Sequence, residues 1–520
     1  MTDPSSPLNT ERSGAHLGHR VVNSALILWS LNMAMRGLQL VTLAILARVL
    51  TPADFGVVAI ATTVMIILEV LTNVQIGSAL VRARELDASH LATAFTLNML
   101  RGFAMAGLLA VAAAPLARFM EAPGLEAIFY VLTIPTILNG LNNPYFTLYS
   151  RNLDFRKDSQ RRMLSALTGN IASILLALLL RTYWALVIGQ VVQAIVILAL
   201  SYWRVPGRPG VSLKHHREML GFGFWLLIQN LFLQLALRIE IFFIGKVLDA
   251  NTVGAYSIGN QVNTMATGDV IPTLTRAMFP AFSIMGDDPE RVRRNYVQVQ
   301  AAGLAIALPI GFGLALVAEP LIYLLFGHGW ELAILVVQIM SPVSALQTVG
   351  AGVEALAMAM GKVRMLAMRS VLYMILRTAL MLVGYYYGGL VGLLVGRAVS
   401  GIFQSFYGLS LAAVLTRRNL FAPFQASWRS LASAAMMSAV AMLLPDAAFQ
   451  TMSEPMLAVQ LIVRGGVCAI VYLGTHGLLW MMAGRPEGAE TRVVGQVSRL
   501  VGKLLRMRVG ARLTWPRADR

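Results

Sequence analysis

Apolar runs long enough to cross a lipid bilayer recur along almost the whole chain. A transmembrane helix needs about 20 mostly apolar residues, and inside the hydrocarbon every backbone polar group must be hydrogen-bonded within the protein. Only 13% of the residues are charged and 57% are hydrophobic, whereas about a quarter of a soluble domain is charged. The pattern predicts an all-α membrane protein. About fourteen transmembrane helices are expected, at 21–46, 54–80, 91–117, 124–148, 163–180, 183–202, 220–245, 254–282, 296–318, 331–358, 366–385, 387–415, 430–445 and 457–482.

Basic residues are distributed unevenly between the two sides of these spans. With the N-terminus in the cytoplasm, about 31 of the 42 Lys and Arg residues fall in cytoplasmic segments, and only Arg48, Arg118, Arg181 and Lys246 fall in the opposite loops. Cytoplasmic loops carry an excess of Lys and Arg in membrane proteins. The sequence therefore predicts that both termini are cytoplasmic. Because this asymmetry accounts for most of the net charge of +17, no nucleic-acid partner is expected.

Two stretches of the chain are nearly the same. "ILARVLTPADFG" begins at Ile45 and "FIGKVLDANTVG" begins at Phe243, 198 residues later, with a basic residue, Val-Leu and the last Gly in register. Six predicted spans separate them, and an even number preserves orientation, so the halves are expected to be parallel repeats about an axis along the membrane normal. The glycine would let the following helix pack closely against a neighbour. We expect two parallel six-helix lobes around a central cavity, plus two C-terminal helices.

The domain boundaries follow from this repeat. The last segment places valines and leucines on one helical face and basic residues on the other, which is typical of an amphipathic helix on the cytoplasmic membrane surface; a solvated tail helix is the alternative. The expected parts are a cytoplasmic N-tail (1–20), an N-lobe (21–202), a basic cytoplasmic linker (203–219), a C-lobe (220–415), helices 13 and 14 (430–482) and the basic tail (484–520).

Charged residues within the spans are the candidate site residues, because charge at membrane depth is costly and usually functional. Several spans carry polar residues at helical spacing, which predicts a large aqueous cavity rather than a narrow pore. Arginine outnumbers acid there, and its planar guanidinium suits bidentate capture of phosphate, so the expected substrate is an anion such as a pyrophosphate. The predicted substrate-binding residues are Asn32, Arg36, Asn98, Arg101, Arg238, Arg276, Arg377 and Arg397.

The acidic residues within the spans are candidates for coupling to H⁺ or Na⁺, because burial raises a carboxyl pKa toward neutrality. They are Glu69, Glu240, Asp269 and Glu354. Arg238 and Glu240 are two residues apart and cannot pair on one helical face. Pairing between the arginines and these acids, as for Arg276 with Asp269, is the structural alternative for both sets. Arg36 and Arg101 have no acid on their own polar stripe.

No catalytic apparatus is recognisable in the sequence. The predicted outer loops are short and no phosphate-binding Walker motif occurs, so we expect neither an enzyme nor a bound cofactor. His215 and His216 lie in the basic linker without ligand partners nearby in the sequence, so no metal site is expected. The single cysteine, Cys468, excludes a disulfide within the chain.

Five phrases of the chain resemble a known family of transporters. They are "ARVLTPADFGVVAIATTV", "LYSRNLDFRKDSQRRM", "IGKVLDANTVGAYSIGNQV", "FPAFSIMGDDPERVRRNY" and "LIYLLFGHGWELA". Together with fourteen spans and a parallel repeat, they resemble the polysaccharide transporter branch of the multidrug/oligosaccharidyl-lipid/polysaccharide exporter superfamily, which contains the Wzx-type flippases. The resemblance covers about 20–420. The chain departs from many relatives in having "RIEIFFIG", with Arg238 and Glu240, where Asn-Leu-Asp precedes Ile-Gly.

The resemblance implies a function. A member would move an undecaprenyl-pyrophosphate-linked oligosaccharide, the repeat unit of lipopolysaccharide, capsule or exopolysaccharide, across the bacterial inner membrane by alternating access coupled to H⁺ or Na⁺. Polysaccharide polymerase and export machinery would be further partners. The alternative is a cation-coupled multidrug exporter of the same superfamily, for which an acidic cavity would be expected. The surplus of arginine within the spans favours the flippase.

Overall fold

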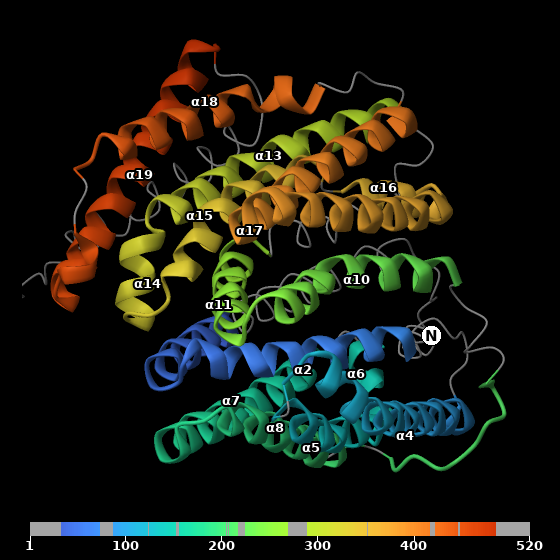
Figure 1. Cartoon of the computed structure of the whole chain (residues 1–520). Helices are drawn as coiled ribbons and strands as arrows, with labels where there is room; N and C mark the ends of the chain where they lie inside the picture. Colours follow the sequence, from blue (N-terminus) through green and yellow to red (C-terminus); the bar gives the residue numbers. More distant parts are fainter. Residues whose placement is uncertain are drawn as a thin grey trace, which may run out of the picture. The chain divides into compact units, whose positions relative to one another are not determined.

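The computed structural model describes residues 33–72, 87–122, 124–151, 155–203, 205, 207–216, 224–268, 289–350, 352–416, 422–445 and 448–484. Every regular element in these ranges is a helix, and no β-strand occurs among them (Figure 1). The all-α prediction is therefore confirmed. The predicted amphipathic helix of the tail, from residue 485 onward, lies outside the described residues.

The chain forms two compact units. Unit 1 comprises Met1–Gln261, Ile322–Val336 and Val363–Val383, and unit 2 comprises Val262–Leu321, Val337–Lys362 and Gly384–Arg520. The helices α11 (Ala250–Thr267), α14 (Ala318–Phe326), α15 (Glu331–Leu346) and α17 (Val363–Thr416) contribute residues to both units.

Unit 1 otherwise consists of the helix at 33–49 and the elements that follow it. These are α2 (Pro52–Thr72), α4 (Ala88–Phe119), α5 (Gly124–Gly140), η1 (Pro144–Phe146), α6 (Thr147–Arg151), α7 (Phe155–Leu180), α8 (Trp184–Tyr202) and α10 (Phe224–Val247). Unit 2 otherwise consists of α13 (Pro289–Leu316), η2 (Gln347–Gly350), α16 (Val353–Ala359), α18 (Ala422–Met442), η3 (Phe449–Thr451) and α19 (Glu454–Met482).

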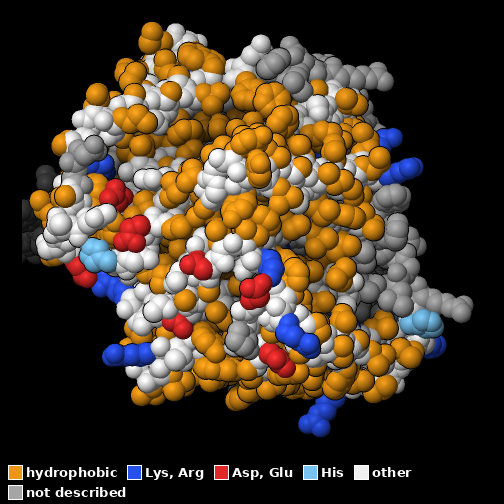
Figure 2. Space-filling view, viewed as in Figure 1, with side chains coloured by type: hydrophobic (Ala, Val, Ile, Leu, Met, Phe, Trp, Pro, Cys, Tyr) orange, Lys and Arg blue, Asp and Glu red, His pale blue; other side chains and the backbone are white. Residues whose placement is uncertain are grey.

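Each predicted span contains a helix in the part of the chain that is described. Nine of these helices are long and apolar enough to cross a membrane. Many of their large apolar side chains are exposed, such as Val111, Leu179 and Ile462, and the face shown in Figure 2 is mostly hydrophobic. Apolar side chains that no protein surface covers are typical of helices that face lipid. The chain is a multi-pass membrane protein.

Helix breaks occur where glycine or proline disrupts the predicted spans. The span predicted at 124–148 ends early, at Gly140, because Pro144 begins a short 3₁₀ helix. The division predicted between 385 and 387 falls close to Gly388 and Gly389, whose backbone is not helical within α17. Gly389 has a φ of 55°, a conformation that costs little only for a residue without a Cβ.

The two copies of the repeat contact each other reciprocally within unit 1. A Cβ on Gly56 would overlap the carbonyl oxygen of Ala250, and a Cβ on Gly254 would overlap that of Pro52. Gly56 and Gly254 are 198 residues apart, and so are Pro52 and Ala250. Gly56 therefore contacts the counterpart of the residue that Gly254 contacts, and the reverse also holds. Such reciprocal contacts are expected when a two-fold axis relates the two copies. The glycines thus allow α2 and α11 to begin in contact. The repeat predicted a close approach at each glycine but not that the two copies would meet.

The last two helices pack onto α13 within unit 2. Their shared core includes Leu304 and Leu308 of α13, Met437 of α18 and Cys468 of α19. The Tyr472 hydroxyl donates to the Ala305 carbonyl at 2.9 Å, which satisfies the one polar group that this side chain brings into the core.

Candidate functional site

A polar pocket of about 270 Å³ lies among five helical segments of unit 1. Five carboxamide side chains line it: Gln39, Asn170, Gln190, Gln193 and Gln261. Four hydroxyls join them, from Thr42, Thr62, Ser173 and Ser257. The remaining lining is apolar or glycine, and no charged side chain belongs to it.

Helical periodicity explains why these residues share one pocket. On α8, Leu186, Gly189, Gln190 and Gln193 follow the i, i+3, i+4, i+7 pattern that places side chains on one face. The same pattern holds for the lining residues of the helix at 33–49 and of α2, while α11 contributes a pair at i, i+4. Each helix therefore presents a mixed polar face to the pocket.

Two glycines bring α7 and α8 close together at this pocket. A Cβ on Gly169 would lie 3.0 Å from the Gly189 carbonyl oxygen, and a Cβ on Gly189 would overlap the Ser173 hydroxyl. A larger residue at either position would move the helices apart and change the pocket. The close approach is a packing use of glycine, familiar from membrane helices.

One hydroxyl of the pocket lacks a hydrogen-bond partner. Thr42 is buried, and its Oγ1 has no partner among the described residues. Since buried polar atoms are nearly always hydrogen-bonded, an unpartnered one in a pocket wall calls for a water or a ligand. Amides and hydroxyls both donate and accept hydrogen bonds, so the pocket is suited to a neutral, hydroxyl-rich molecule.

Arg101 and Glu69 form an ion pair between α4 and α2. The distance from Arg101 Nη2 to Glu69 Oε1 is 3.5 Å, and the side chains are 24% and 47% exposed. The sequence showed no acid on the polar stripe of Arg101, and the partner comes from the neighbouring helix. Asn98 lies one turn before Arg101 and is half-buried. Both charges of the pair remain accessible to a ligand.

Arg377 and Glu240 form a second ion pair, between α17 and α10, buried in unit 1. The Arg377 Nη2 donates to Glu240 Oε2 at 2.5 Å, and the side chains are 3% and 1% exposed. Arg377 Nη1 also donates to the Tyr373 hydroxyl at 2.5 Å. The structure thus joins a predicted substrate-binding residue to a predicted ion-coupling residue, and each neutralises the other.

The remaining predicted site residues are in three situations. Arg36, one turn before Gln39 on the helix at 33–49, is half-buried, and so are Glu354 and Arg397 of unit 2. Arg238 is half-buried, and its Nε has no hydrogen-bond partner among the described residues. Asn32, Asp269 and Arg276 lie outside the described residues, so the alternative of an Arg276–Asp269 pair stays untested.

Sequence reasoning missed most of the pocket. Asn170 and Ser173, and likewise Gln190 and Gln193, are three residues apart in predicted spans, a helical spacing that places both side chains of a pair on one face. The free-energy cost of a neutral amide at membrane depth is much smaller than that of an arginine, so amides alone are a weaker sign of a functional site. A search for all polar stripes, charged or not, would have found them.

Two relatives connect the chain to polysaccharide biosynthesis. It is 31% identical over 301 residues to the "Succinoglycan biosynthesis transport protein ExoT" of Rhizobium meliloti (strain 1021), a match that covers 57% of this chain and 60% of that protein. It is 25% identical over 335 residues to the "Lipopolysaccharide biosynthesis protein WzxC" of Escherichia coli (strain K12), which covers 63% of this chain and 67% of the relative.

A solved structure and a family model complete the comparison. The fold is similar to that of the lipid II flippase MurJ in an inward closed conformation, with a TM-score of 0.68 and 13% identity, over 88% of this chain and 100% of that one. The model of the family described as "Polysaccharide biosynthesis protein" matches residues 45–335. Because this match covers more than half of the chain, the chain belongs to that family of polysaccharide biosynthesis proteins.

Proposed function

We propose that the chain is a flippase that moves an undecaprenyl-pyrophosphate-linked oligosaccharide across the bacterial inner membrane by alternating access. The observation that carries the proposal is the uncharged pocket of amides and hydroxyls in unit 1. Such a lining can pair with several sugar hydroxyls at once, and the family concerns polysaccharide biosynthesis. The names of the two relatives, a transport protein for succinoglycan and a lipopolysaccharide biosynthesis protein, support the same substrate class.

The pyrophosphate of this substrate would be bound by arginines within the spans. Arg36 and Arg101 are the best candidates, because both are partly exposed members of unit 1. Arg238 and Arg397 remain candidates. Arg377 is a weaker one, because its charge is already matched by Glu240 in a buried pair. Guanidinium groups bind phosphate oxygens in bidentate fashion, which a lysine cannot reproduce.

Transport would draw on an H⁺ or Na⁺ gradient, with Glu69 and Glu354, which are both partly exposed, as the candidate coupling carboxylates. Polymerase and export proteins would receive the flipped unit. The excess of Lys and Arg in one set of loops supports cytoplasmic termini. A multidrug exporter would instead require an acidic pocket for cationic drugs, and the lining of the unit 1 pocket contains no carboxylate.

The pocket is tested by Asn170→Ala combined with Gln190→Ala. Loss of two side-chain hydrogen bonds to the sugar should reduce transport by about 5- to 150-fold, since each bond contributes about 0.5–1.5 kcal/mol. The readouts are surface polysaccharide and lipid-linked precursor in the inner leaflet, in a polysaccharide-producing strain without its own flippase, at equal protein level. Gln298→Ala, which removes an exposed amide of α13, is the matched control. Unchanged polymer in the double variant would contradict a sugar-binding pocket.

A further inference from the structure

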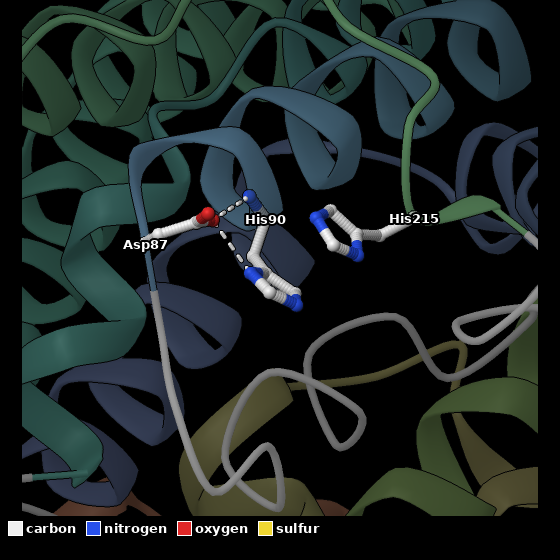
Figure 3. Close-up of side chains that lie close together, drawn as sticks. All are labelled: Asp87, His90 and His215. Carbon is white, nitrogen blue, oxygen red and sulfur yellow. Dashed lines mark hydrogen bonds and ion pairs between the residues drawn. The ribbon is translucent and has the colours of Figure 1, made fainter.

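Three side chains with metal-binding atoms meet at the N-terminus of α4. Asp87 is the N-cap residue, and its carboxylate accepts from the His90 backbone N–H at 2.9 Å. His90 lies one turn into the helix, and His215 comes from residues 207–216, far along the chain after α8. Figure 3 shows the two imidazoles side by side, with the Asp87 carboxylate directed at His90.

Hydrogen bonds to α4 hold His215 at this place. The Ser212 backbone N–H donates to Thr96 Oγ1 at 3.0 Å, and the His215 backbone N–H donates to Thr93 Oγ1 at 3.4 Å. The His215 ring itself bonds to the Ser89 hydroxyl through Nε2 at 2.9 Å. Ser89, Thr93 and Thr96 lie at i, i+4 and i+7 and therefore share one face of α4. The linker segment is fastened along that face.

The distances among the three groups are short enough for one ion. Asp87 Oδ1 lies 2.6 Å from His90 Nδ1, and the two imidazole rings are stacked with centroids 3.7 Å apart and planes 17° apart. One potential ligand atom from each residue lies within 4.8 Å of the other two. Because imidazole lone pairs lie in the ring planes, the stacked rings would give up their parallel arrangement by rotating about χ2, a soft torsion, to direct their nitrogens at a common ion.

The hydrogen bonds also assign the tautomers. The Ser89 hydroxyl donates its single proton to Asp87 Oδ1 at 2.8 Å, so its oxygen accepts from His215 Nε2–H. The neutral His215 ring then carries its lone pair on Nδ1. Without an ion, His90 donates Nδ1–H to Asp87 Oδ1. A metal ion bound by both of these atoms would replace that proton, since ligands bind metals in their deprotonated form. A hydrogen bond on the nitrogen that does not bind the ion, as for His215 Nε2 here, is the usual arrangement around a bound metal.

We propose that Asp87, His90 and His215 form a binding site for a divalent transition-metal ion, with zinc the best match, that fastens residues 207–216 to α4. Imidazole nitrogen suits zinc and its neighbours in the first transition row, whereas calcium and magnesium take oxygen ligands. Two histidines and a carboxylate leave the fourth tetrahedral position to water, and the exposed side of Asp87 provides access to water. Binding across two segments stabilises the folded form by linkage.

The experiment uses the full chain in detergent, purified through a tag without histidine and stripped of metal with chelator. Titration with Co²⁺, followed by its d–d absorbance, should show one site, and Zn²⁺ should displace the Co²⁺. X-ray absorption of the zinc-loaded parent protein should show two imidazole ligands. A parent protein that binds neither ion stoichiometrically, or a zinc site without two imidazoles, would overturn the proposal without any variant.

Variants locate the site. His90→Gln and His215→Gln should each weaken Co²⁺ binding by about a hundredfold or more, because losing even an outer partner of a ligand costs about 10- to 100-fold. His216→Gln, which changes the adjacent imidazole outside the cluster, should bind like the parent. Zinc should raise the unfolding temperature of the parent and of His216→Gln only. Equal binding in all three variants would place the ion elsewhere and refute the site.

Discussion

Two Arg–Glu pairs of unit 1 contain the same chemical groups in opposite surroundings. Arg377 and Glu240 are almost completely buried, whereas Arg101 and Glu69 are partly open to solvent. The buried pair is also the closer one, 2.5 Å against 3.5 Å. In a low dielectric each charge would be very costly without its partner, while an open pair is screened and contributes little.

The difference in exposure between the two pairs indicates which arginine is available to a substrate. Arg377 could bind a pyrophosphate only by giving up its contact with Glu240 in the interior, so we expect it mainly to join α17 to α10. Arg101 can exchange a weak contact with Glu69 for a phosphate at small cost. A third pair, Lys246–Glu121, joins the last turn of α10 to a residue just after the end of α4. Its Glu121 side chain is 81% exposed, so this pair is the most solvent-exposed of the three.

The largest effect on stability is expected when the buried Arg377–Glu240 pair is broken. Glu240→Gln or Arg377→Met alone should lower the free energy of unfolding by about 3–5 kcal/mol, because the remaining charge is buried without the opposite charge of its ion pair. The double variant Glu240→Gln with Arg377→Met should recover much of that loss. Unfolding in detergent followed by circular dichroism measures all three proteins. A double variant as unstable as the sum of the singles would show that the two groups are not coupled.

Breaking the open pair should change transport more than stability. Arg101→Ala should alter the free energy of unfolding by no more than about 1 kcal/mol, yet reduce surface polysaccharide and raise the lipid-linked precursor. Arg101→Lys should fail to restore transport if the guanidinium binds phosphate in bidentate fashion. The same assays on Glu69→Gln show whether the acid matters beyond its contact. Normal polymer in Arg101→Ala at normal protein level would make this arginine structural.

The exposed Lys246–Glu121 pair at the helix ends should show the smallest effect and a dependence on pH. The hydrogen bond from Lys246 Nζ, at 2.7 Å, lowers the pKa of the Glu121 carboxyl below its ordinary value. A lowered carboxyl pKa contributes stability above the unfolded value of about 4.5, which is lost as the pH falls through the folded value. The unfolding temperature of Glu121→Gln should equal that of the parent at pH values below the folded pKa of Glu121. At pH 7 it should be at most slightly lower than that of the parent. A large deficit at pH 7 would contradict the solvent-screened character of the pair.

The sequence by itself determined the helices and their repeat. Span positions depend on local runs of apolar residues about the length of a bilayer, so helices appear at all of them in the described residues. The helix breaks at Gly140 and at Gly388–Gly389 depend on glycine and proline nearby, which are also local signals. The matched Gly56 and Gly254 showed the register of the repeat before their reciprocal contacts were visible.

Only the tertiary structure decided which polar groups meet. Glu240 pairs with Arg377, which lies 137 residues later in the chain. His215 contacts the N-terminal turn of α4, more than a hundred residues before it. Five helical segments supply the polar pocket, each with an unremarkable stripe of amides or hydroxyls. A single helix reveals which residues share its face but not which face it turns toward a neighbour. That choice follows from close packing between helices, to which residues from distant parts of the chain contribute together.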